Sequence, residues 1–239
     1  MVRITLDKPY IPIPVLVAVK YGLLYNWYAA TDARLICADG WDIQTYDEQT
    51  DFITYLGGQT VAGGKLKETG FEHWISNTGA TNEVNYNGRG AGIRSGVDGS
   101  FSVIGQNMNI WSKTEQSASA GYGKNICIGS STATSNIGGT KKGGFSLRPY
   151  RAATAPELLL PDGAVSATYT GNDLKIYRCT KINDRIYVAD NLCETKFRNG
   201  DWIPGFDGGV YTPFSNAAWA ALTTGALCAY NNDWSNVLI

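Results

Sequence analysis

The chain has 239 residues, of which 44% are hydrophobic and 17% are charged, and its formal net charge is −1. This composition supports one large domain or two small ones with a buried core, and it excludes an intrinsically disordered chain. The balanced charge, together with the lack of a dense Lys/Arg run in the sequence, excludes nucleic acid as the main partner.

Residues 1–20 are predicted to form an extended N-terminal arm, because Pro9, Pro12 and Pro14 disfavour a helix. Such an arm could dock on a neighbouring subunit or a larger assembly, or it could be a simple edge strand. The apolar run from Ile11 to Val19 is too short to span a bilayer and starts too late for a secretion signal. We therefore expect no membrane insertion.

The strongest helix signal begins at Thr45, because Thr45-Tyr46-Asp47-Glu48 has the form of a capping box. The helix is expected to end at Gly57-Gly58. Its acidic residues Asp47, Glu48 and Asp51 are interpreted as a solvated face rather than as a metal site. Beyond it, residues 77–145 are rich in Gly, Ser, Thr and Asn, which predicts short strands separated by long ordered loops.

The last third of the chain predicts a connector, a hairpin and a helix. Residues 152–164 contain two prolines and are interpreted as a linker or a packed connector. Residues 175–178 and 185–189 alternate like paired strands, with Asn183-Asp184 in the turn. A short helix is expected from Ser215 to Leu222, with Ser215 or Asn216 as its N-cap and its end near Gly225.

The chemistry-bearing residues are few. The five cysteines are scattered without a C-x-x-C pair, which excludes a Cys-rich zinc site and a dense disulfide framework. His73 is the single histidine, so imidazole-based acid–base or metal chemistry has little raw material. We therefore expect no catalytic residues, no bound metal and no cofactor.

One set of ordered motifs resembles a known family. Tyr21-Gly-Leu-Leu-Tyr-Asn-Trp-Tyr-Ala-Ala30 is similar to the hallmark of the Fibrobacter succinogenes major paralogous domain family. Further motifs of that family follow in order: Gly40-Trp41, Ala62 to Gly70, Asn77 to Glu83, Trp111-Ser112 and Gly144 to Arg148. Pro149 stands where the family often has a Cys, which puts any disulfide from Cys37 in doubt.

The resemblance implies an α+β, C-type-lectin-like fold of the formylglycine-generating-enzyme kind. That fold has small twisted antiparallel sheets, two or more short helices and long ordered loops. The enzyme relatives need a reactive cysteine pair or copper ligands, and the sequence offers no candidate for either. An enzyme of that type is therefore disfavoured.

The C-terminal block resembles the first half of the same family. The matching segments are 182–192, 194–200, 203–204, 216–222 and 228–233. The halves then stand in permuted order, with residues 21–151 as the second half, 152–164 as a connector and 165–239 as the first half. Either the chain is circularly permuted, which we favour, or the block completes a neighbouring subunit by swapping. Permutation predicts that Tyr21 and Trp234 lie close together.

Residues 105–143 match the family least. In the lectin-fold variable proteins of diversity-generating retroelements, which this chain resembles, the hypervariable region lies at this place. The resemblance implies a ligand-binding surface here, on a fixed scaffold. The expected members are Asn107, Asn109, Trp111, Gln116, Ser119, Tyr122, Lys124, Asn125, Ser130 and Ser135. Singly, each could be an ordinary solvated loop residue, and the motif position of Trp111 favours a scaffold role.

Together these features predict a non-catalytic protein that binds a protein or glycan ligand on a cell surface. A phage host-attachment component, at the virion surface or extracellular, fits this expectation, and homo-oligomerisation is left open. One alternative is a structural or assembly module of a virion or surface particle. Another is a calcium-dependent carbohydrate-binding lectin using Asn231-Asn232-Asp233, although its usual Glu-Pro-Asn motif is missing from the sequence.

Overall fold

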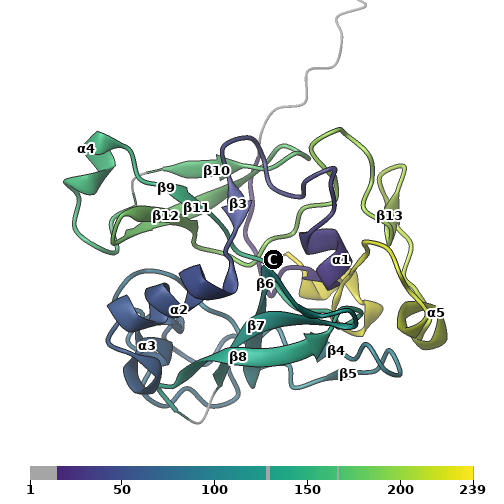
Figure 1. The fold of residues 1–239 in the computed structure, drawn as a ribbon, viewed down its shortest axis with the longest axis horizontal. Coiled ribbons are helices and arrows are strands. Elements are labelled where there is room, and N and C mark those ends of the chain that lie inside the picture. The colour runs from purple at the N-terminus through teal and green to yellow at the C-terminus, as the bar shows by residue number, and fades with distance from the viewer. Residues whose placement is uncertain (1–14, 128–129, 166, 239) are drawn as a thin grey trace, which may run out of the picture.

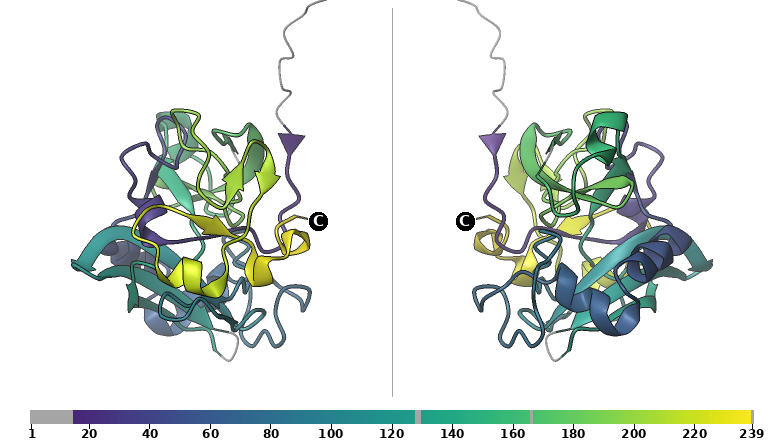
Figure 2. Two further views of the ribbon diagram at one scale, coloured as in Figure 1. Left: turned by 90° about the vertical axis from the view of Figure 1, so that its right-hand side faces the viewer. Right: turned by 90° about the vertical axis from the view of Figure 1, so that its left-hand side faces the viewer.

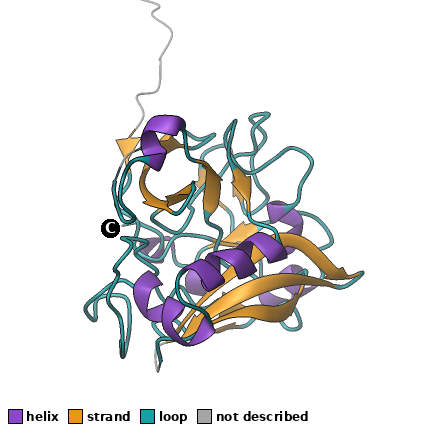
Figure 3. Ribbon diagram, turned by 60° about the vertical axis from the view of Figure 1, so that its left-hand side comes forward, coloured by secondary structure: helices purple, strands orange, loops and turns teal. Residues whose placement is uncertain are grey.

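The computed structural model describes residues 15–127, 130–165 and 167–238, so most of the predicted N-terminal arm, residues 1–14, lies outside the described residues. The described chain is a mixed α+β structure of small, mostly antiparallel sheets and a few short helices (Figures 1 and 3). The helices are α1 (Trp27–Ala30), α2 (Tyr46–Tyr55), α3 (Gln59–Leu66), α4 (Ala155–Leu158) and α5 (Asn216–Ala220), with 3₁₀ turns at Tyr230–Asn232 and Trp234–Asn236.

The largest sheet among the described residues joins the N-terminal part of the chain to residues 149–188. Its strand order is β1 (Val15–Leu16), β11 (Lys175–Ile182), β12 (Arg185–Val188), β9 (Pro149–Ala152) and β3 (Asp42–Ile43), and β10 (Thr168–Thr170) also pairs with β11. The predicted hairpin is β11–β12, in which Ile182 pairs with Arg185 and Asn183 adopts a positive φ of 55° in the turn. Asn tolerates this left-handed conformation better than most residues, which explains its place in the turn.

A second sheet consists of three long antiparallel strands, β6 (Asn107–Ser117), β7 (Ala120–Cys127) and β8 (Ala133–Thr140). The expectation of short strands and long loops was wrong for this segment, because β6 alone has 11 residues. Two-stranded pairs complete the fold: β2 (Leu24–Tyr25) with β15 (Leu227–Cys228), β4 (Ile93–Arg94) with β5 (Phe101–Ser102), and β13 (Phe206–Asp207) with β14 (Val210–Tyr211).

Helix α2 forms where its capping box predicts. The Thr45 hydroxyl accepts a hydrogen bond from the Glu48 amide (3.2 Å), and the Glu48 carboxylate accepts one from the Thr45 amide (2.8 Å). Gly57 and Gly58 follow with positive φ values of 102° and 89°, which ends the helix. Helix α5 starts at the predicted N-cap, Ser215, and ends at Ala220, earlier than expected.

Helices α3 and α4 were not predicted. Helix α3 is hard to recognise from the sequence, because it contains two glycines and Gly lowers helix propensity. They are required by close packing: a Cβ on Gly63 would lie 2.1 Å from the Thr132 carbonyl oxygen, and one on Gly64 would lie 2.3 Å from that of Gly79. Helix α4 lies within the connector 152–164 and is opened by a Thr154–Glu157 capping box.

The C-terminal block packs into the same core as residues 19–147. Leu227 of β15 pairs with Tyr25 of β2, and the Tyr25 hydroxyl donates to the Glu194 carbonyl at 2.8 Å. The Tyr21 amide donates to the Asn236 carbonyl at 3.0 Å, two residues from Trp234. In Figure 2 the C-terminal segment runs beside the described start of the chain. The two blocks therefore share one hydrophobic core within a single chain.

Candidate functional site

The β6–β8 sheet, which carries the predicted binding surface, is covered on both faces along much of its length. Helices α2 and α3 lie against one face (Figure 3), where Phe52 and Leu66 share an apolar cluster with Ile126. On the other face Trp111 stacks on Phe145, with ring centroids 4.1 Å apart. β6 and β7 are therefore covered on both faces over much of their length, whereas Thr134, Gly138 and Thr140 of β8 are exposed.

Glycines in the sheet make room for these rings. A Cβ on Gly121 would lie 2.4 Å from Cδ1 of Trp27, and one on Gly139 would lie 2.7 Å from Cη2 of Trp111. Glycine within a strand often marks such a close approach. Gly121 and Gly139 therefore lie in strands that pack directly against aromatic rings, and not in loops.

Three of the ten predicted surface residues are buried, which corrects the assignment of Asn109 and Lys124 to an exposed surface and agrees with the scaffold role favoured for Trp111. Trp111 is 0% exposed and donates from Nε1 to the Tyr25 carbonyl at 2.9 Å. Asn109 is 6% exposed and accepts a hydrogen bond from the side chain of Asn125. Lys124 is 1% exposed and extends under α2. The sequence pattern alternates along the strands, but it does not reveal that both faces are covered.

The Lys124 ammonium lies 4.6 Å from the centroid of the Phe52 ring, and no carboxylate pairs with it among the described residues. Burial lowers the pKa of Lys124 to about 7, because the charged form loses its hydration without gaining a counter-charge. Lys124 is therefore a structural residue beneath α2.

The other predicted residues differ in exposure. Asn107, Tyr122, Asn125 and Ser130 are half-buried, and Tyr122 packs its ring against Tyr46 with centroids 4.5 Å apart. The backbone of Ser135 belongs to β8, but its side chain lies outside what the structure describes. Among the predicted residues whose side chains are described, only Gln116 and Ser119 are exposed.

Those two residues belong to the end of the β6–β7 hairpin, where residues 115–119 are all exposed. Glu115 pairs there with the nearly buried ammonium of Lys141 at 3.1 Å, which anchors the base of this end. In Figure 1 the hairpin end projects from the sheet beside α1. The structure thus places an exposed, polar hairpin end on a buried, ring-packed sheet.

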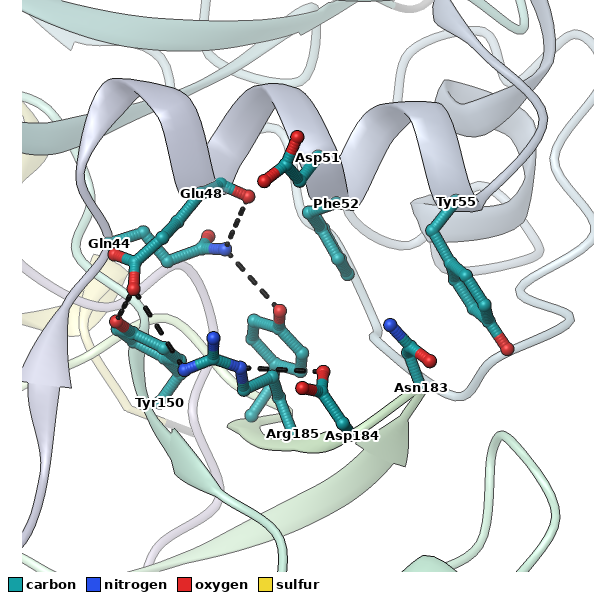
Figure 4. Close-up of a pocket in the computed structure, with 10 residues that line it drawn as sticks. Gln44, Glu48, Asp51, Phe52, Tyr55, Tyr150, Asn183, Asp184 and Arg185 are labelled. Carbon is teal, nitrogen blue, oxygen red and sulfur yellow. Dashed lines mark hydrogen bonds and ion pairs between the residues drawn. The ribbon is translucent and has the colours of Figure 1, made fainter.

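A second candidate site is a groove of about 170 Å³ between α2 and the β11–β12 turn. Figure 4 shows Glu48, Asp51 and Tyr55 on the helix side, facing Asp184 and Arg185 on the hairpin side. The remaining lining residues are the buried rings of Phe52, Tyr150 and Tyr187, the buried Gln44 and the exposed Asn183.

Contacts across this groove join its two sides. Tyr150 donates its hydroxyl proton to the Glu48 carboxylate, and Arg185 lies 3.9 Å from Glu48 and 3.4 Å from Asp184. Burial acts to raise the pKa of Glu48, but its hydrogen bonds from Tyr150 and Thr45 outweigh burial, and the pKa is lowered. Glu48 is therefore a carboxylate that holds the groove together.

The sequence interpretation missed this groove, because it assigned the acidic residues of α2 to a solvated face. Asp51 and Asp47 are exposed, but Glu48 faces the hairpin. A signal was present: residues 48, 51 and 55 follow the spacing of one helix face. No local sequence pattern indicates that the turn at Asn183-Asp184 packs opposite that helix face.

The described cysteines, Cys37, Cys179, Cys193 and Cys228, are free and buried. Burial raises the pKa of the Cys179, Cys193 and Cys228 thiols to about 12, so each remains protonated near neutrality. Within the described ranges, no three His, Cys, Asp or Glu side chains form a metal-binding group. Likewise, none of the described helices has the length and apolar character needed to cross a membrane.

The Asn231-Asn232-Asp233 segment, considered for calcium, is engaged within the fold. Asn231 and Asn232 adopt positive φ values of 55° and 56°. The Asn232 side-chain oxygen accepts from Arg94 (3.2 Å) and Tyr211 (3.3 Å), and Asp233 caps the following turn by accepting from the Ser235 amide. These contacts engage the Asn232 side-chain oxygen and Oδ1 of Asp233 within the fold.

Comparison with known protein families gives a match over much of the chain. The model of the Fibrobacter succinogenes major domain matches residues 17–150, which is more than half of the chain. No curated protein matches. No solved structure matches either. The matched range contains α2 and the whole β6–β8 sheet, whereas the hairpin side of the groove lies beyond it.

Proposed function

We propose that this chain, which belongs to the Fibrobacter succinogenes major domain family, is a non-catalytic binding protein with a variable surface on a C-type-lectin-like scaffold. The proposed ligand is a protein or glycan on a cell surface. The proposed setting is a phage host-attachment component, at the virion surface or extracellular, diversified by a retroelement.

The observation that carries this proposal is the division within the β6–β8 sheet. Trp111 within the sheet is buried, as are Phe52 and Phe145 packed against it, whereas residues 115–119 at the hairpin end are exposed. The side chains of residues 116–119 can change without loss of core contacts, because exposed substitutions usually alter stability by less than about 0.5 kcal/mol. A rigid scaffold with a replaceable end suits a surface whose ligand changes.

The DNA next to the gene tests the proposed diversification by a retroelement. We expect a reverse transcriptase gene beside a near-copy of the codons for residues 105–143, with adenines as the substituted bases. Codons for buried positions such as Trp111 should differ less between copies than those for Gln116 and Ser119. Relatives from one lineage that vary evenly along the whole chain would contradict the proposal.

A display library tests the surface itself. Full-length chains randomised at residues 116–119 are selected against a panel of unrelated proteins and immobilised glycans. We expect most members to stay folded and some to gain binding. A matched library randomised at Asn109, Trp111 and Lys124 should lose folded members, because those side chains are buried. A stable oligomer that buries the 106–143 face would instead favour the assembly module.

A further inference from the structure

A pocket of about 160 Å³ lies beside Tyr21, near the described start of the chain. We call it the Tyr21 pocket, and its lining residues are Tyr21, Phe71, Glu72, Trp74, Ile75, Ile104 and Gly105. It shares no residue with the groove between α2 and the β11–β12 turn, or with the hairpin end at 115–119. The Tyr21 pocket is therefore a separate feature of the molecule.

Two large apolar side chains of the Tyr21 pocket are exposed to solvent. Phe71 is 75% exposed and Ile75 is 70% exposed, whereas Trp74 between them in the sequence is 2% exposed. Single exposed apolar residues are common on protein surfaces, but two such side chains at one pocket are typical of an interaction surface. The pocket thus has the apolar character of a site that another polypeptide segment covers.

The polar groups of the Tyr21 pocket are available to a partner. The Tyr21 hydroxyl makes no hydrogen bond with a described residue, and its pKa is raised by burial and by the carboxylates of Glu68 and Glu72. It therefore stays protonated and can donate. Glu72 is exposed, and within the described ranges it forms no ion pair or side-chain hydrogen bond. The pocket combines apolar contact with a hydrogen-bond donor and a negative charge.

This combination of groups suits a proline-rich segment with a flanking basic residue. Such a segment adopts an extended helix whose backbone carbonyls have no internal hydrogen bond, and its rings pack into grooves lined by aromatic side chains. A tyrosine hydroxyl can donate to one of those carbonyls, and a carboxylate can pair with the basic residue. The chemistry of the pocket therefore indicates the class of its occupant.

The chain itself carries a sequence of this class in residues 1–14, which lie outside the described residues. Lys8-Pro9-Tyr10-Ile11-Pro12 is followed by Pro14, and the charge of Lys8 is complementary to that of Glu72. The prolines of the described chain are more widely spaced in the sequence: Pro149, Pro156, Pro161, Pro204 and Pro213. Residues 8–14 are therefore the segment of this sequence that matches the pocket.

The course of the chain favours the pocket of a second copy over that of the same copy. Strand β1 (Val15–Leu16) is paired with β11, and the chain runs from it towards Tyr21. Residues 8–14 come before β1, so they would have to turn back past it to reach their own pocket. Prolines at alternate positions favour an extended backbone instead. At about 3.1 Å per residue, an extended segment of this length spans about 40 Å from residue 1, which is enough to reach a neighbouring molecule.

We propose that the Tyr21 pocket binds residues 8–14 of a second copy of this chain. The prolines pack against Phe71 and Ile75, the Tyr21 hydroxyl donates to a backbone carbonyl of the segment, and Lys8 pairs with Glu72.

This contact leaves the hairpin end at 115–119 uncovered, because the pocket contains none of its residues. Copies joined through their N-terminal segments would present several hairpin ends together, which strengthens binding to a surface that carries repeated ligands.

Complementation between two variants of the full chain tests the proposal. The pocket variant carries Phe71→Ser and Ile75→Ser, and the arm variant carries Pro9→Ser and Pro12→Ser. In sedimentation velocity we expect the parent chain to self-associate as its concentration rises, and each variant to associate at least about tenfold more weakly. An equimolar mixture of the two variants should form a mixed complex, because one retains the pocket and the other retains the segment.

Two outcomes would overturn the proposal. A parent chain that stays monomeric at all concentrations has no contact of this kind between copies. Weaker association of the pocket variant with unchanged association of the arm variant would assign the pocket to a different segment.

Reversal of the charged pair locates the contact. Lys8→Glu and Glu72→Lys should each weaken self-association by about fivefold, and the double variant K8E/E72K should recover the parent affinity, because the pair forms again with its charges exchanged. Asp47→Lys reverses an exposed charge outside the pocket and should not rescue K8E. Rescue by D47K would reduce the effect to general charge attraction and contradict the proposed pairing.

Exposed apolar residues outside the pocket provide the matched control for the pocket variant. Val97 is 78% exposed and Leu159 is 86% exposed, so a chain with Val97→Ser and Leu159→Ser loses comparable apolar surface. Its self-association should equal that of the parent, and an equal loss in both variants would contradict a specific pocket. Thermal unfolding of each variant verifies that the fold persists.

Discussion

At the scale of single residues, buried cations hold together a chain that is rich in loops. Arg148 is 2% exposed and donates to the carbonyls of Tyr86, Val188 and Asn87. Arg94 is fully buried and donates to the carbonyls of Gly99 and Phe214. Loop carbonyls that lack a strand or helix partner are satisfied in this way, which a buried backbone requires.

Lys124 differs from these arginines, because its ammonium group contacts the face of the Phe52 ring and not a set of backbone carbonyls. Its pKa is about 7 in the folded protein and 10.5 when unperturbed. The unfolded chain therefore binds more protons between these values, and stability should rise as pH increases from 7 to 10.5. Below pH 7 the full cost of burying the charge remains.

Lys124→Met should stabilise the protein at pH 7 by about 1–4 kcal/mol, because it replaces an unpaired buried charge by an apolar chain of similar length. It should also flatten the pH dependence between 7 and 10.5. Chemical denaturation across that range measures both effects. Lys113→Met on the neighbouring strand, where the lysine side chain is 36% exposed, is the control and should show neither.

Glu68 has the opposite linkage. Burial acts to raise its pKa, but hydrogen bonds from His73 and Arg89 outweigh burial and lower the pKa to about 2. A carboxyl whose folded pKa is depressed from 4.5 contributes stability that is present above pH 4.5 and lost as pH falls toward 2.

Glu68→Gln should therefore lower stability at neutral pH and reduce the loss of stability between pH 4.5 and 2. Urea unfolding at several pH values tests this expectation. Glu72→Gln changes an exposed neighbour and should leave the loss of stability between pH 4.5 and 2 unchanged. If E68Q and the parent protein lost the same amount of stability at acid pH, Glu68 would be excluded as the titrating group.

At the scale of elements, the β6–β8 sheet depends on glycines that admit rings. Helix α1 directs Trp27 onto Gly121, and Trp27 Nε1 donates to the Ser112 carbonyl of β6 at 3.0 Å. This packing fixes the sheet beneath the exposed hairpin end, so the proposed binding surface rests on a contact that the strand propensity of the segment does not reveal.

Gly121→Ala should destabilise the protein by about 1–3 kcal/mol, because the added methyl overlaps the indole of Trp27. Gly138→Ala is the matched control on the adjacent strand, where the added methyl meets only the end of the exposed Gln116 side chain. Thermal unfolding measures the melting temperatures of both variants. Equal melting temperatures would show that the Trp27 contact is not required.

At the scale of the whole molecule, residues far apart in sequence share one core. Val19 pairs with Leu238, so the two ends of the described chain lie side by side. The connector between the blocks is exposed, with Leu159 at 86% exposure. This arrangement is what circular permutation of a compact domain needs.

A permuted chain can be made that starts at residue 161 and ends at residue 160, with a short Gly/Ser linker joining residue 239 to residue 15. We expect it to fold and to give the same circular dichroism spectrum as the parent chain. Its melting temperature should lie within a few degrees of the parent value, because the contacts of the core are unchanged. The same cut without the linker, as two separate fragments, is the control, and neither fragment should unfold cooperatively alone. A permutant that fails to fold would contradict the proposed relation between the halves.

Local sequence determined the features that depend on neighbouring residues. The capping box placed α2, the Asn183-Asp184 turn placed the β11–β12 hairpin, and Ser215 placed the start of α5. The ordered motifs identified the family, because their order and spacing do not depend on how the chain folds. Each signal lies within a few residues of the structure that it predicts.

Tertiary structure alone decided which polar residues are exposed. Strand alternation assigns side chains to two faces, but only packing shows that helices and rings cover both faces at Asn109, Trp111 and Lys124. The groove likewise joins Gln44 and Tyr187, which are 143 residues apart. Burial and long-range contact depend on where the whole chain returns in space, and no local pattern carries that information.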